Sequence, residues 1–226
     1  MSVSEDRTVQ PSPTTAGPAT GIADPAPLGL AAFALTTFLL SAKNANWMGS
    51  ATGAAFLGYA FAYGGLAQLL AGMWEFRNRN VFGAVAFSTY GGFWIGLGIW
   101  YQLVAVPAIT GARTPVAVAA AVTTVNHDVG WILLGFAIFN TYMLILSTQV
   151  NMAVFGVFLT LEITEIILFI GNFAAGAAVK PTGLIIFGGY VGIVTALVAW
   201  YTSAALVSRG MAGSKILLPV GKPIIS

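Results

Sequence analysis

Two carboxylic acids, Glu162 and Glu165, lie three residues apart in a long apolar stretch of the chain. An ionisable side chain in such a setting is costly, and by default it has a function. We therefore expect the pair to take up and release a proton while the protein works. The alternative is that both carboxyls are protonated and hydrogen-bonded to neighbouring helices, and the sequence leaves the two interpretations open.

The chain has one histidine, His127, which is followed by Asp128. One His beside one Asp is neither a nucleophilic triad nor a metal site. Asp128 is expected to cap the helix that follows it, because Asp is a favoured N-cap residue. Cysteine is absent, and so are HExxH, GxSxG and Gly-rich phosphate loops. The sequence therefore predicts no enzyme, no cofactor and no metal site.

The composition indicates which elements must position these residues. Of the 226 residues, 58% are hydrophobic and only 7% are charged, whereas a soluble domain has about 25% charged residues. The sequence therefore predicts a membrane protein whose surroundings are the lipid bilayer, with no nucleic-acid partner. The first apolar run follows a polar segment that lacks a basic region and cleavage site, so a secretory signal peptide is not expected.

Six apolar stretches each approach the roughly 20 residues that cross the hydrocarbon as a helix. The predicted fold class is all-α, a polytopic membrane protein with spans at 27–45, 51–74, 81–104, 129–148, 153–173 and 184–207. These spans make up a transmembrane domain at 24–208. Residues 1–23, rich in Pro, Ser and Thr, are expected to be a disordered tail, and 209–226 a second tail.

Basic residues in the loops predict the orientation, because cytoplasmic loops carry the excess of Lys and Arg. The side that holds both termini carries six of them: Arg7, Arg77, Arg79, Arg209, Lys215 and Lys222. The other side carries Lys43, Arg113 and Lys180. We expect a multi-pass protein of the plasma or inner membrane with both termini cytoplasmic. Glu75, close to Arg77 and Arg79, is expected to belong to a solvated loop cluster.

The first span opens with a helix-start signal, because Asp24 is an N-cap type and Pro25 suits the first helical position. We expect backbone N–H groups to remain open at this helix mouth, where they favour an anion. The negative charge of an Asp at this position partly cancels the positive field of the helix N-terminus, although Asp can also serve simply as the cap. The segment resembles the NPAPLGL signature of the acetate uptake transporter family, with Asp in place of Asn, over seven residues: Asp24, Pro25, Ala26, Pro27, Leu28, Gly29 and Leu30.

The resemblance extends along the chain in the family's order and spacing. Residues 61–68, followed by Ala71-Gly72 and Glu75, resemble the family's second helix. Residues 82–94 resemble its third helix, and Gly171-Asn172 the end of its fifth. The resemblance implies a homo-hexamer with one pore per protomer and small carboxylate anions, acetate and possibly succinate, as partners.

In this family an apolar constriction narrows the pore, and the matched motifs put its positions at Phe33, Tyr90 and Leu161. Helical spacing then adds residues on the same faces. The residues expected on the face of Phe33 are Thr36, Thr37, Leu40 and Asn44. Those expected on the face of Leu161 are Phe158, Thr164, Glu165, Leu168 and Asn172. Glu162, about 100° round the helix from Leu161, is expected to face a neighbouring helix or subunit. The permeases generally carry apolar or hydroxyl residues at the two Glu positions.

The predicted function is a membrane channel or transporter for small monocarboxylates, which passes the anion through the constriction and couples it to protons. A non-transporting membrane sensor or scaffold is the alternative. A retinal pump is disfavoured, because Lys43 and Lys180 lie near span ends and six helices are too few.

Overall fold

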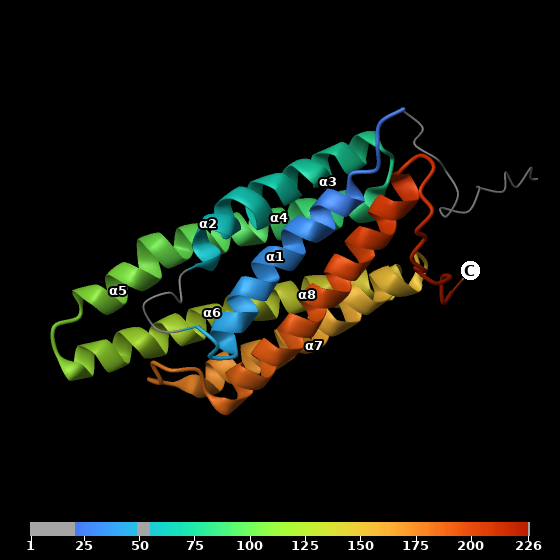
Figure 1. Ribbon diagram of the computed structural model, residues 1–226. Helices are drawn as coiled ribbons and strands as arrows, with labels where there is room; N and C mark the ends of the chain where they lie inside the picture. The colour runs from blue at the N-terminus through green and yellow to red at the C-terminus, as the bar shows by residue number, and fades with distance from the viewer. Residues whose placement is uncertain (1–20, 49–54, 226) are drawn as a thin grey trace, which may run out of the picture.

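The computed structural model describes residues 21–48 and 55–225, and all regular structure within them is helical. Six helices in this part of the chain are long and apolar enough to cross a membrane, which confirms the predicted fold class. Figure 1 shows them as an elongated bundle. Most of the tail expected at 1–23, and the beginning of the span expected at 51–74, lie outside the described residues.

Four of the six spans are single regular helices, and the first of them is the shortest. These are α1 (Ala26–Asn44), α6 (Pro115–Ser147), α7 (Met152–Ala175) and α8 (Gly183–Gly210). The second span is composed of α2 (Phe56–Phe61), a π-helical turn η1 (Ala62–Ala67) and α3 (Gln68–Arg77). The third is composed of α4 (Val81–Trp100), a second π-helical turn η2 (Tyr101–Ala105) and α5 (Val106–Gly111). Consecutive spans are antiparallel, so α1, α4 and α7 run in the same direction (Figure 1).

The helices α4, α6 and α7 each begin after a residue whose side chain caps the helix, and the start of α6 corrects the sequence prediction. The Thr114 side chain accepts a hydrogen bond from the Ala117 N–H at 3.2 Å, and Pro115 occupies the first helical position. Alanine and valine then continue α6 without a break, so the helix begins well before the expected residue 129. His127 and Asp128 consequently lie inside α6, and the expectation that Asp128 caps a helix is wrong.

Glycines let neighbouring backbones come into direct contact at several crossings. A Cβ on Gly189 of α8 would overlap the Ala45 backbone nitrogen at the end of α1. A Cβ on Gly91 of α4 would lie 2.7 Å from the backbone nitrogen of Leu69 in α3. Small residues are what allow membrane helices to pack this closely. The abundant glycine of this sequence therefore has a packing role at these two crossings.

The segment after α8 folds back along the end of the bundle. The Tyr201 hydroxyl donates to the Pro219 carbonyl at 2.6 Å, and the Ala153 N–H donates to the Val220 carbonyl at 2.8 Å. The Ile224 N–H also donates to the Thr148 carbonyl at 2.7 Å. This segment thus ties α8 to the connection between α6 and α7.

Candidate functional site

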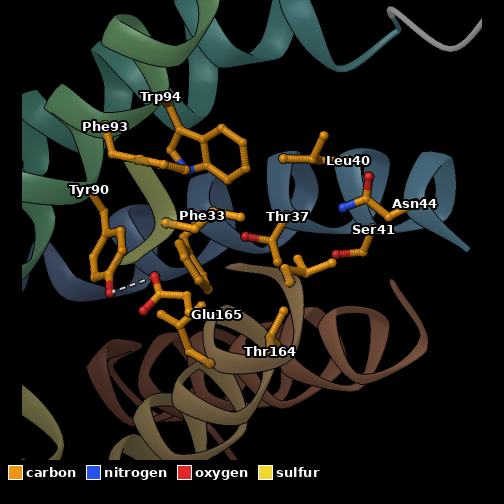
Figure 2. Close-up of a pocket in the computed structure, with 13 residues that line it drawn as sticks. Phe33, Thr37, Leu40, Ser41, Asn44, Tyr90, Phe93, Trp94, Thr164 and Glu165 are labelled. Carbon is orange, nitrogen blue, oxygen red and sulfur yellow. Dashed lines mark hydrogen bonds between the residues drawn. The ribbon is translucent and has the colours of Figure 1, made fainter. Parts of the chain in front are cut away.

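Two cavities lie one above the other within the bundle, and both are bordered by Phe33, Tyr90 and Leu161. The first has about 40 Å³ of space for water-sized molecules and the second about 30 Å³. The first, drawn in Figure 2, is also lined by Thr37, Leu40, Ser41, Asn44, Phe93, Trp94, Leu133, Thr164, Glu165 and Leu168. The second is also lined by Leu30, Gln68, Ala86, Phe87, Val157 and Phe158.

The order of these residues along three parallel helices establishes how the cavities are stacked. On α1, α4 and α7, the residues of the second cavity come earlier in the helix than those of the first. Phe33, Tyr90 and Leu161 stand at the boundary on their respective helices. Because these helices run in the same direction, the two cavities follow each other along the bundle axis with these three side chains at their junction.

The junction is closely packed and mostly apolar. Phe33, Tyr90 and Leu161 are all buried, and the Phe33 and Tyr90 rings meet edge to face with centroids 5.6 Å apart. Phe136 and Phe139 of α6 also pack on Tyr90, at 5.9 and 5.5 Å between ring centroids. Such contacts hold the tyrosine ring in one orientation.

A hydrogen-bonded network connects Tyr90 to both glutamates. The Tyr90 hydroxyl lies 3.0 Å from Asn140 Oδ1 and 3.3 Å from Glu165 Oε1, and it shares its one hydrogen between these two acceptors. Asn140, fully buried on α6, donates to Glu162 Oε2 at 2.7 Å and to the Phe158 carbonyl at 3.0 Å. The network therefore runs from the first cavity through α6 to Glu162.

The two glutamates occupy different surroundings. Glu165 is only 4% exposed and borders the first cavity, where Figure 2 shows its bond with Tyr90. Glu162 points at α6, where it also accepts a hydrogen bond from Thr141 Oγ1 at 2.7 Å. Asn140 was missed by the sequence analysis, although an amide between Phe139 and Thr141 inside an apolar stretch is a signal of a buried hydrogen-bonded group.

Other residues expected along the substrate path are distributed unevenly. Thr37, Asn44 and Thr164 border the first cavity, but Thr36 and Asn172 border neither. Thr36 Oγ1 accepts a hydrogen bond of 3.1 Å from the Gly64 N–H in η1. Asn172 donates to the carbonyl of Leu168 in its own helix at 2.8 Å.

The heptapeptide at the start of α1 has a structure that differs from the open helix mouth expected. Asp24 Oδ1 accepts the Ala26 N–H at 2.9 Å, and the Leu28 N–H donates to the Pro25 carbonyl at 3.1 Å. Pro27 has no N–H to offer. The first amides of α1 are thus already paired, so the expectation of free N–H groups at this end is wrong. Of the seven residues, Leu30 borders the second cavity.

Glu75 also corrects a sequence prediction, because it is fully buried rather than part of a solvated loop cluster. Its Oε2 accepts a hydrogen bond from Asn78 Nδ2 at 3.1 Å. Its Oε1 would lie 2.8 Å from a Cβ built on Gly83, in the first turn of α4. The absence of a side chain at Gly83 leaves room for the Glu75 carboxyl beside the first turn of α4, where Oε1 has no hydrogen-bond partner among the described residues.

The chain is similar to proteins whose names describe transport, and it spans less than two thirds of the length of several of them. The chain is 38% identical over 206 residues to acetate permease A of Emericella nidulans, covering 88% of this chain and 65% of the permease. It is 30% identical over 204 residues to the succinate-acetate/proton symporter SatP of Escherichia coli, covering 90% of this chain and 97% of the symporter.

A solved structure of the bacterial acetate channel SatP matches with a TM-score of 0.72 and 30% identity, covering 88% of this chain and 99% of that one. Residues 6–220 match the GPR1/FUN34/yaaH family. The family match covers nearly the whole chain. The chain belongs to the GPR1/FUN34/yaaH family.

Proposed function

We propose that this protein conducts small monocarboxylates, acetate above all, and also the dicarboxylate succinate, through the centre of each protomer. One observation carries the proposal: two cavities follow each other along α1, α4 and α7, and Phe33, Tyr90 and Leu161 close the junction between them. The names of the relatives, an acetate permease and a succinate-acetate/proton symporter, support the same class of substrate.

The three junction residues act as the constriction. A ring of apolar side chains excludes water and bare ions, so it blocks leak in the resting state. A short organic acid differs from a bare ion because its hydrocarbon part contacts such a ring without penalty. Polar side chains next to the junction, Thr37 and Thr164 in particular, replace part of the water that its carboxylate loses. Asn44 does the same at the far end of the first cavity.

Glu165 is the proton-carrying group in this proposal, and Glu162 acts on it through Asn140 and Tyr90. An anion that crosses a membrane together with a proton carries no net charge, which removes the electrical cost of its passage. Thr36, Asn172 and residues 24–30 contribute by shaping the helices that border the path, through their bonds to the backbone.

The remaining parts of the proposal concern assembly and location. We propose a homo-hexamer with one pore per protomer, in the plasma or inner membrane, with both termini in the cytoplasm. Large apolar side chains exposed on the outside of the bundle, such as Leu103, Trp131 and Ile138, suit contact with lipid or with another protomer. The excess of basic residues on the side of the termini supports the orientation. A sensor or scaffold remains the alternative class.

Uptake of labelled acetate into proteoliposomes, with uptake by protein-free liposomes subtracted, tests the proposal. We expect protein-dependent uptake that changes in rate or solute selectivity in Tyr90→Ala. Tyr142→Ala is the matched control, because Tyr142 lies on the exposed side of α6 and borders neither cavity. Absence of protein-dependent uptake would overturn the function, and equal behaviour of the two variants would overturn the constriction.

A further inference from the structure

We propose that the first cavity contains a carboxylate-binding site made by three hydrogen-bond donors, Trp94, Thr37 and the protonated form of Glu165. The site admits the substrate's carboxylate only together with one proton. The inference rests on the proposed function and deepens it, because it names the binding groups and the stoichiometry of proton and substrate.

The first argument is that three polar atoms around this one cavity lack partners. Six buried side-chain nitrogen and oxygen atoms of the described residues have no hydrogen-bond partner, and three of them belong to this site: Trp94 Nε1, Thr37 Oγ1 and Glu165 Oε2. Their side chains are only 2%, 6% and 4% exposed, and all three border the cavity. Buried polar groups in proteins nearly always have a partner, and leaving one without is costly. Three such atoms around one space are typical of a site that a polar ligand completes.

The second argument is the chemistry of the three groups. The Trp94 N–H can only donate, and the Thr37 hydroxyl can donate once. A carboxylate can only accept, so both suit it. An ionised Glu165 would also only accept and would repel the ligand, whereas a protonated one donates through its O–H. The donor set is therefore complete when Glu165 carries the proton.

The third argument is that the described residues place no positively charged side chain at the site. No Lys, Arg or His is among the residues that line the first cavity. The titratable groups that act on Glu165 are Tyr90 from α4, which bonds its Oε1, and Glu162 from α7, which is bonded to α6. The α1 and α6 side chains that line the cavity are hydroxyl, amide or apolar. One proton on Glu165 thus prevents two negative charges from meeting when the anion enters.

Tyr90 leaves this role open to Glu165. The Tyr90 hydroxyl donates to Glu165 Oε1. The other oxygen of Glu165, Oε2, has no partner among the described residues, so its O–H is free to donate to the ligand. When substrate is bound, two carboxyl groups share one proton, because two carboxylates in contact cannot both be ionised. The proton either stays on Glu165 or moves to the substrate, and the pair holds one negative charge in both cases. Departure of the neutral acid leaves Glu165 ionised, and departure of the anion leaves it protonated.

The test is the pH dependence of the KM for labelled acetate in proteoliposomes, with equal pH on both sides. From about pH 6 upward acetate itself is fully ionised. In the wild type we expect the KM to rise with pH, up to about tenfold per pH unit, once the empty protein releases the Glu165 proton. Glu165→Gln should show the wild-type low-pH KM at every pH, because its amide donates permanently.

Two further variants separate binding from structure. Trp94→Phe keeps the ring and removes the N–H, so it should raise the KM about tenfold at all pH values while keeping the wild-type slope. Glu75→Gln is the matched control, since it also changes a fully buried carboxyl but borders neither cavity. It should keep the wild-type slope. All variants are compared after elution at the wild-type volume in gel filtration.

The outcomes distinguish this inference from the function on which it rests. No protein-dependent acetate uptake by the wild type would overturn the proposed function. Uptake with an unaltered pH slope in Glu165→Gln, or with an unchanged KM in Trp94→Phe, would overturn the binding site and leave the function standing. If Glu165→Gln does not elute as the wild type does, Trp94→Phe and Thr37→Val decide, and unchanged KM values in both overturn the site.

Discussion

The Tyr90 hydroxyl lies 3.0 Å from Asn140 Oδ1, and this bond connects the junction of the two cavities to a fully buried amide on another helix. Asn140 is in turn bonded to Glu162 and to the backbone of α7. The orientation of the tyrosine ring is therefore fixed by a group that does not itself border either cavity.

Asn140→Leu should release Tyr90 while keeping the volume of the side chain. The Tyr90 hydroxyl and Glu162 would each lose a partner, at a cost of about 1–3 kcal/mol for a buried group. We expect a lower unfolding temperature in detergent and a change in the rate or selectivity of acetate uptake. Thr141→Val, which removes a bond to Glu162 from an exposed position, is the control and should have the smaller effect on both. Equal effects would contradict a positioning role for Asn140.

Tyr90→Phe should separate the two properties of the tyrosine. The ring remains and keeps the apolar junction closed, so we expect the relative uptake of acetate and larger acids to match the wild type. The hydroxyl is lost, so Glu165 Oε1 and Asn140 Oδ1 lose their shared donor. We therefore expect the pH profile of uptake to shift while size selectivity stays. Loss of size selectivity in this variant would show that the ring alone does not form the constriction.

Gly91→Ala and Gly92→Ala form a matched pair on α4. A Cβ on Gly91 would lie 2.7 Å from the backbone nitrogen of Leu69, whereas one on Gly92 meets nothing within 4 Å. Overpacking against a backbone costs about 1–3 kcal/mol, while alanine favours a helix by up to about 1 kcal/mol over glycine. Gly91→Ala should thus lower the unfolding temperature and Gly92→Ala should not. A lower unfolding temperature in Gly92→Ala would contradict the open space that surrounds Gly92.

Asp24→Ala should weaken the start of α1, because it removes the acceptor of the Ala26 N–H. Loss of such a cap costs about 1 kcal/mol. Asp24→Asn keeps a side-chain oxygen and should retain the wild-type unfolding temperature. The measurement is thermal unfolding in detergent at neutral pH. Should Asn lower stability as much as Ala, the charge of Asp24 rather than its hydrogen bond would be the stabilising property.

Composition and the spacing of apolar stretches were enough to predict the class of fold. Apolar stretches of membrane-crossing length in a chain with few charges leave the backbone no partners other than its own helix, so six spanning helices follow. Local chemistry also predicted a helix start at Asp24-Pro25, since capping and the fixed proline backbone act within a few residues. The structure begins α1 one residue later, at Ala26 with Pro25 as the N-cap. The start of α6 lies earlier than predicted, because the Thr114 cap and the alanine-rich run after it form an equally local helix-start signal.

Which residues of neighbouring helices meet depends on how the helices pack in the assembled bundle. Periodicity identifies a face of one helix but not the residue opposite it, so neither the Tyr90–Asn140 bond nor the burial of Glu75 against Gly83 could be derived from spacing. Thr36 and Thr37 are adjacent in the sequence, yet Thr36 meets η1 and Thr37 borders the first cavity. The distinction arises because packing energies depend on which surfaces meet in three dimensions, and only the assembled bundle fixes that.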